Sequence, residues 1–337
     1  MARRLAVSGM MGMASVILLA LVSLIGFGSL NADAQRIAFS IATGPSSGTY
    51  FPVGEIIAGL ISHPPGVDRC VRSQSCGPEG LIATAQTSPG AYANVLAVES
   101  GRANSALAQS DIVAQAIAGK GPFKTKQTHI RTIAALFPEE VHLIVSPRSK
   151  IKDIYRLRGK RVSVGAADSG TAVTARAVLS AFRVRVKASD DPPDVAAQKL
   201  RDGKIDAFFF VGGTPVPVVA SLIDSGRGAL LPIDGKGRTR LLAREKGMSA
   251  DVIPAGTYSR GPTVETVSVR ALWIVSDQTP KDTVYGVARA LFSPANRSAL
   301  DQGPAAARSI SISNAQRNLT APLHPGAAKF YRDVGKS

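Results

Sequence analysis

The sequence predicts an α/β protein of two lobes, joined by two strands that cross between them. Strand-like and helix-like segments alternate over nearly the whole chain after residue 35, which is the pattern of βαβ units with helix-covered parallel sheets. With 337 residues, 45% of them hydrophobic, the chain is long enough for two cores. The strand and helix within residues 267–292 have no local sheet of their own, so the chain must return to its first lobe.

Residues 1–34 have the features of a secretory signal peptide. Arg3 and Arg4 form a positive start, residues 5–30 carry no charge, and residues 32–34 form an A-x-A cleavage pattern. We therefore expect cleavage after Ala34 and a periplasmic location. The uncharged stretch could also span a bilayer, so a retained anchor is the alternative. No cysteine follows the segment to carry a lipid.

The first lobe is predicted from residues 35–144 together with 267–337, and the second from residues 145–266. In the first lobe we expect strands at 37–42, 81–87, 105–109 and 130–136, and helices at 52–61, 91–99, 111–118, 283–292 and 327–334. In the second lobe we expect strands at 161–167, 184–189, 205–211 and 229–233, and helices at 172–182, 194–200 and 216–224. The apolar runs 141–146 and 267–276 are the two crossing strands. This arrangement places a cleft between the lobes, at the carboxyl ends of strands.

Cys70 and Cys76 are the only cysteines, and they lie in a polar segment rich in glycine and proline. Two neighbouring cysteines in an oxidising compartment usually pair, so we expect a disulfide. Their spacing is not that of a zinc site, so we expect no metal site at these cysteines and no cofactor. The sequence leaves open whether a metal ion accompanies the ligand.

Four loops, each joining a strand to a helix, are rich in glycine, serine and threonine: residues 44–50, 109–111, 168–171 and 210–213. Small residues let backbone N–H groups approach a ligand, and a helix N-terminus adds a positive dipole end. Such loops meeting across a cleft would bind a carboxylate without a lysine. Each loop alone is more typical of helix capping, and the presence of four of them in the order of a two-lobe sheet favours a binding site.

The net charge of +16 falls to +15 without residues 1–34, which hold two arginines and one aspartate. The basic residues are scattered over the whole length rather than grouped with aromatic residues. We therefore expect no nucleic-acid partner, and we interpret the charge as aiding solubility and the steering of anions. The mature protein is expected to be soluble and monomeric.

The chain resembles the TAXI family, the extracytoplasmic solute receptors of TRAP transporters, over residues 36–334. The matching stretches, in order, are SSGTYFPVG, AQSD followed by GKGPF, RTIAALFPEEVHLIV, LRGKRVSVG, DSGTAVTAR, KLRDGKIDAFFFVGG, VIPAGTY and LHPGAAKFYRDVG. Two features depart from the family pattern: the cysteine-bearing segment within residues 63–80 is long, and Pro45 stands where the family often has glycine.

The resemblance implies a type II periplasmic-binding fold and closure around a small organic anion, glutamate-like or another carboxylate. It also implies delivery of this ligand to small and large TRAP membrane subunits, driven by an ion gradient. The ligand contacts that it implies are Ser47, Gly48, Thr49, Tyr50, Gln109 and Ser110 from the first lobe and Ser169, Gly170, Thr171, Phe210 and Gly212 from the second.

Two other functions are compatible with parts of the sequence. The same fold could serve a membrane sensor without transport. Residues 44–48 also match the G-x-S-x-G pattern of serine hydrolases, with His324 as a base, but no earlier strand could supply the second oxyanion donor, so we do not expect an enzyme.

The remaining candidates for acid–base or phosphate chemistry have structural explanations. Residues 165–171 have the glycine spacing of a P-loop but lack its lysine. Glu139 and Glu140 are adjacent in an extended segment, so one is expected to cap or form a salt bridge and the other to be solvated. His142 is expected in the core with a hydrogen bond, and His324 at the start of the last helix.

Overall fold

A computed structural model describes residues 36–73, 75–259 and 261–335. The predicted signal peptide lies outside these residues. The strands are β1 (Ile37–Ala42), β2 (Leu81–Gln86), β3 (Ser105–Gln109), β4 (Ile130–Val145), β5 (Arg161–Ser163), β6 (Lys187–Ser189), β7 (Ala207–Gly212), β8 (Ala229–Leu230), β9 (Ser249–Ile253) and β10 (Val264–Ser276). Their path is β2-β1-β3-β10-β4-β7-β5-β6, with β8 paired to β4 and β9 to β10.

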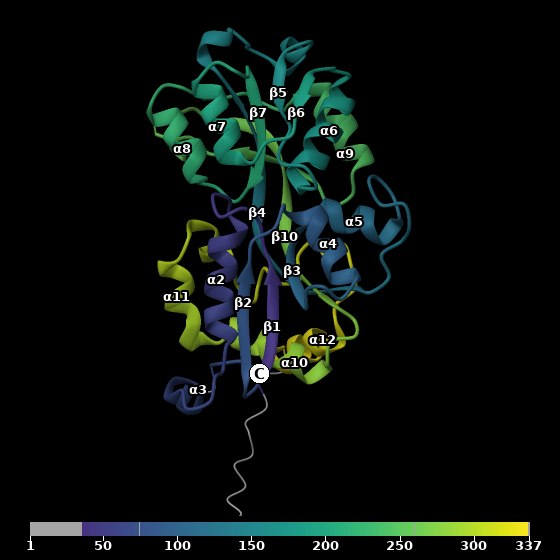
Figure 1. Ribbon diagram of the computed structural model, residues 1–337, viewed down its shortest axis with the longest axis vertical. Coiled ribbons are helices and arrows are strands. Elements are labelled where there is room, and N and C mark those ends of the chain that lie inside the picture. The colour runs from purple at the N-terminus through teal and green to yellow at the C-terminus, as the bar shows by residue number, and fades with distance from the viewer. Residues whose placement is uncertain (1–35, 74, 260, 336–337) are drawn as a thin grey trace, which may run out of the picture. The chain divides into compact units, whose positions relative to one another are not determined.

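Helices flank this sheet in both lobes (Figure 1). They are α2 (Tyr50–Ile61), α3 (Asp68–Ser73), α4 (Ala91–Glu99), α5 (Ser110–Ala118), α6 (Gly170–Phe182), α7 (Pro193–Arg201), α8 (Pro217–Asp224), α9 (Gly235–Arg244), α10 (Lys281–Leu291), α11 (Arg297–Gln302) and α12 (Pro325–Val334). Among the described residues, no helix has the length and apolar character needed to cross a membrane.

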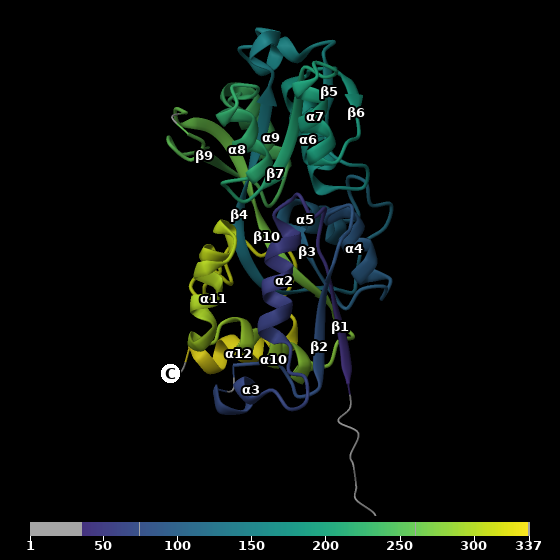
Figure 2. The same ribbon diagram turned by 60° about the vertical axis from the view of Figure 1, so that its left-hand side comes forward.

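The two crossing strands, β4 and β10, are the longest in the described structure, with 16 and 13 residues. They pair antiparallel from Ser276–Ile130 to Ser268–Glu140. Beyond Glu140, β4 pairs with β7, whereas β10 pairs with β3 at one end and with β9 at the other. Both strands therefore belong to both lobes, as Figure 2 also shows. The predicted α/β fold of two lobes with two crossing strands is confirmed.

Strand β4 is one continuous strand where two were predicted. The predicted segments 130–136 and 141–146 are joined through Pro138, although proline cannot donate to a ladder. In the structure Pro138 lies opposite Arg270, next to a register shift between Arg270 and Leu272, so the irregularity accommodates the missing N–H group.

Separate hydrophobic cores fill the two lobes. One core gathers buried residues from 39–137 and 271–331. The sheet of the second lobe is covered on both faces: Phe209 packs into one core, and Phe208 and Phe210 pack into another on the opposite face. Successive strand residues point to opposite faces, so this run of three phenylalanines is explained by a strand buried on both sides.

Four elements were not predicted: α3, α9, β9 and α11. Two glycines near the start of α9, Gly235 and Gly237, favour a loop in sequence-based reasoning. Gly237 is needed where it stands, because a Cβ atom there would lie 2.4 Å from the ring of Phe182. Strands β5, β6 and β8 are also shorter than predicted.

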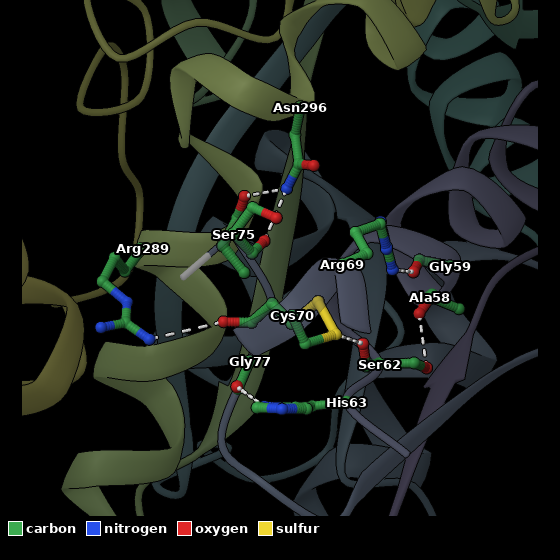
Figure 3. Close-up of a disulfide and its surroundings, with 12 residues drawn as sticks. Ala58, Gly59, Ser62, His63, Arg69, Cys70, Ser75, Gly77, Arg289 and Asn296 are labelled. Carbon is green, nitrogen blue, oxygen red and sulfur yellow. Dashed lines mark hydrogen bonds between the residues drawn. A yellow bond between two sulfur atoms is a disulfide. The ribbon is translucent and has the colours of Figure 1, made fainter. Parts of the chain in front are cut away.

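Cys70 and Cys76 form the predicted disulfide beside α3, with their Cα atoms 5.1 Å apart. Figure 3 shows the backbone contacts around it: Arg289 donates to the carbonyl of Cys76, and Asn296 Nδ2 donates to the carbonyl of Ser75 at 2.7 Å. The disulfide thus lies in a segment that is tied to α10 and to the turn before α11.

Replacing both cysteines by alanine is expected to lower the free energy of unfolding by about 2 kcal/mol, because the bond closes a short loop in the unfolded chain. Neither cysteine lines the interlobe cavity described below, so ligand affinity should be unchanged. Urea unfolding of the double variant, with and without ligand, measures both quantities. A double variant that loses ligand affinity but keeps the wild-type free energy of unfolding would contradict a purely stabilising role for the disulfide.

Candidate functional site

A cavity of about 60 Å³ lies between the lobes. Its lining from the first lobe is Gly44, Pro45, Gly48, Thr49, Tyr50, Pro89, Gly90, Ala91, Gln109 and Glu139. Its lining from the second lobe is Gly165, Ala166, Ser169, Gly170, Thr171, Asp191, Pro193, Phe209, Phe210 and Val211.

Four helices begin at this cavity. Their first residues, Tyr50 of α2, Ala91 of α4, Gly170 of α6 and Pro193 of α7, all belong to its lining. Only α6 has a side-chain cap among the four, from Ser169 to the N–H of Ala172 at 3.0 Å. The first N–H groups of a helix have no partner within the helix and carry a partial positive charge. The arrangement therefore suits an anion.

The lining contains no lysine, arginine or histidine from the described chain. Its acidic members are Glu139 and Asp191. Asp191 accepts from Lys199 Nζ at 2.5 Å and from Ser189 Oγ at 2.7 Å, and these partners hold the pKa of Asp191 below its ordinary value against the opposing effect of burial. Any positive potential inside the cavity comes from helix ends rather than from basic side chains.

Most of the predicted contacts line the cavity. They are Gly48, Thr49, Tyr50, Gln109, Ser169, Gly170, Thr171 and Phe210. The other three are close by but do not line it. Ser47 Oγ donates to Asp194 Oδ1 of the opposite lobe at 3.4 Å, and Ser110 Oγ donates to the carbonyl of Gly247 at 2.8 Å. Gly212 lies close to the side chains of Phe210 and Thr49, and an added Cβ atom at Gly212 would clash with both.

Gln109 is an interlobe contact as well as a lining residue. Its side chain is 3% exposed, and its Oε1 atom has no hydrogen-bond partner in the described structure. A Cβ atom on Gly170 of the second lobe would lie 1.6 Å from this oxygen and 2.8 Å from Cβ of Ala91. The lobes approach each other this closely because residue 170 is glycine.

Further contacts show that the lobes are closed. Asp111, in the first turn of α5, accepts from Thr174 Oγ1 of α6 at 2.8 Å, and both side chains are fully buried. Gln115 Nε2 donates to Glu245 Oε2 at 3.0 Å, and the N–H of Ala93 donates to the carbonyl of Asp168 at 3.1 Å. Burial raises the pKa of Asp111 to about 7.

Glu139 and Glu140 are both buried, at 1% and 6% exposure, so the prediction that one of the two is solvated is wrong. Glu139 Oε2 accepts from Tyr50 Oη at 2.7 Å, and Glu140 Oε2 accepts from Thr214 Oγ1 at 2.9 Å. Burial raises the pKa of each. The error follows from the missed continuity of β4, which places both residues in mid-sheet rather than at a strand end.

Other lining residues were also missed. Pro89 and Gly90 precede α4, Ala91 begins it, and Gly165 and Ala166 precede α6. Each set lies between a strand and a helix, so the rule that located the four loops could have found them. Glu139 could not have been found in this way, because it lies within β4.

His142 and His324 both have hydrogen bonds within the fold. His142 is fully buried, its Nδ1 lies 2.9 Å from the carbonyl of Glu140 and its Nε2 lies 2.8 Å from Tyr258 Oη, and burial lowers its pKa to about 4. His324 caps α12 by accepting from the N–H of Gly326 at 3.1 Å. The structure records no contact between Ser47 and His324, so it gives no support to the G-x-S-x-G reading.

The chain matches a known protein family, and its fold is similar to those of solved structures. A family model described as NMT1-like matches residues 41–335. MatC from Rhodopseudomonas palustris, solved with bound malate, superposes with a TM-score of 0.52 at 11% identity, covering 90% of this chain and 98% of its own. A structure titled as a periplasmic transporter superposes with a TM-score of 0.51 at 15% identity, covering 89% of this chain and 93% of its own. These likenesses support the two-lobe binding-protein fold.

Proposed function

The chain belongs to the NMT1-like family, and from this premise we propose that it is a periplasmic solute receptor for a small organic anion, held in the cleft between its lobes. The observation that carries this proposal is the convergence of four helix N-termini on a cavity whose lining has no basic side chain in the described chain. Such a site binds a carboxylate through N–H groups and hydroxyl donors.

We further propose that the protein serves a TRAP-type transporter. The stretches SSGTYFPVG and DSGTAVTAR, which resemble the TAXI solute receptors, begin α2 and α6 at the cavity. On this basis the receptor delivers its ligand to the small and large membrane subunits of a TRAP-type transporter. MatC has the same fold at a TM-score of 0.52 and was solved with malate, which supports a carboxylate as the class of ligand.

A thermal-shift screen of residues 35–337 against amino acids, dicarboxylates, 2-oxoacids and sugars tests the ligand class. A ligand at a hundred times its dissociation constant should add about 2.7 kcal/mol of stability. We expect a shift with a family of carboxylates and none with sugars. Shifts only with neutral solutes would contradict the proposal.

The variants Thr171→Ala and Ser47→Ala form a matched pair for locating the site. Thr171 lines the cavity, whereas Ser47 does not. Removing a hydroxyl that donates to a charged ligand costs about 1.5 kcal/mol, so we expect roughly tenfold weaker binding for Thr171→Ala. Ser47→Ala should bind within about twofold of the wild type. Titration calorimetry with the carboxylate found in the screen measures both, and equal losses would place the ligand elsewhere.

A further inference from the structure

We propose that Glu139 contacts the bound anion as a neutral carboxylic acid and donates its proton to a ligand carboxylate, so that binding takes up one proton. The inference rests on the proposed function, since it concerns how the same cavity selects its anion. Glu139 then acts as a specificity-determining residue: it adds one donor to those of the helix ends.

The geometry of Glu139 leaves one oxygen for the ligand. The side chain lines the cavity and is 1% exposed. Its Oε2 accepts from Tyr50 Oη at 2.7 Å, and no hydrogen bond to Oε1 occurs within the described structure. A proton on Oε1 would leave the bond from Tyr50 intact and make Oε1 a donor.

The charged groups around Glu139 oppose its ionisation. Tyr50 of α2, Asp111 of α5 and the adjacent Glu140 act on it directly, and burial, followed by the charges of Asp111 and Glu140, raises its pKa against the effect of the bond from Tyr50. Arg270, on the paired strand β10, interacts electrostatically with Glu140 and Asp251 instead.

Across the cavity, Asp191 of the second lobe is already paired with Lys199. An ionised Glu139 would therefore meet an incoming anion with no nearby cation to offset the repulsion. A proton removes that repulsion without occupying space in a cavity of about 60 Å³. When the lobes separate, water can solvate the carboxylate, and the proton is released.

Linkage gives the size of the effect. If ligand binding requires a proton that the open form does not hold, the affinity for the ligand falls about tenfold for each unit by which the pH rises. A ligand ammonium group is the other way to neutralise Glu139, and the two explanations predict different selectivities. With a neutral acid, a dicarboxylate binds at least as tightly as its α-amino counterpart.

Calorimetric titration between pH 6 and 8 distinguishes a neutral Glu139 from neutralisation by a ligand ammonium group. The probes are two matched pairs: glutarate with L-glutamate, and succinate with L-aspartate. Repeating each titration in phosphate and in Tris gives the number of protons taken up. We expect uptake that falls by one proton in Glu139→Gln, a variant that keeps an oxygen for Tyr50 Oη and presents a neutral donor. Asp301→Asn, which changes an exposed carboxylate of α11 outside the cavity lining, should leave the uptake unchanged.

Several results would overturn the inference. One is tenfold tighter binding of the amino acids, lost in Glu139→Gln, which would assign Glu139 to an ammonium group. Another is binding of glutarate or succinate with a proton uptake that is the same in wild type and Glu139→Gln. Either outcome leaves the carboxylate receptor itself intact. Failure of all four probes and of every other carboxylate in the screen would instead contradict the proposed function.

Discussion

The variant Gly170→Ala is expected to bind carboxylates roughly 5- to 150-fold more weakly than the wild type, since forcing a methyl group into a packed interface costs about 1–3 kcal/mol. The added Cβ atom would lie 1.6 Å from Gln109 Oε1 and 2.8 Å from Cβ of Ala91. Gln109 is buried and cannot swing away freely. The clash exists only while the lobes are together, so it opposes closure rather than folding.

Titration calorimetry measures the loss of affinity, and small-angle X-ray scattering with saturating ligand measures closure. Gly59→Ala is the control, because Gly59 lies in α2 and an added Cβ atom there would meet nothing within 4 Å outside the helix's own backbone. That variant should bind normally and gain up to about 1 kcal/mol of stability. If Gly170→Ala binds and closes as the wild type does, the interlobe contact at Gly170 is not part of the ligand-bound state.

The variant Asp111→Asn is expected to be more stable than the wild type above pH 7, by an amount on the order of 4 kcal/mol at most. Asp111 is fully buried at the lobe interface, its Oδ1 atom has no partner in the described structure, and its pKa rises from 3.8 to about 7. The cause is first of all burial, with a smaller effect from Glu245, while the bond from Thr174 acts in the opposite direction.

The sign of the pH dependence follows from this shift. Between pH 4 and pH 7 the folded protein holds a proton on Asp111 that the unfolded chain has lost, so stability falls as pH rises through this window. Asparagine cannot ionise, and the variant should therefore lack this part of the slope. Urea unfolding at pH 4.5, 6 and 8 measures it. Asp190→Asn, at an exposed carboxylate, is the control, and an Asp111→Asn variant with the wild-type slope would contradict the account.

The order of most helices and strands, and a cleft between the lobes, could be predicted from the sequence, because both depend on local patterns. The strand 37–42, the helix 91–99 and the strand 105–109 have the predicted bounds. The loops before α2 and α6 were recognised because small and polar residues follow an apolar strand at both places.

The missing parts of the site depend on contacts between distant segments. Glu139 enters the cavity lining only because β4 continues through Pro138, which depends on the irregular pairing with β10. The role of Gly170 depends on Gln109, 61 positions earlier, lying against it in the closed form. No local pattern reports either fact. For the same reason the sequence could not show that the hydroxyl of Ser110 donates to the carbonyl of Gly247.

The most direct test of the anion receptor is a crystal structure of the protein grown with the tightest carboxylate from the screen. The account predicts a carboxylate in the cavity between the lobes, within hydrogen-bond distance of first-turn N–H groups of α6 and of the hydroxyl of Thr171, with Glu139 beside it. A ligand bound outside this cavity, or a neutral solute within it that makes no contact with the helix N-termini, would contradict the account.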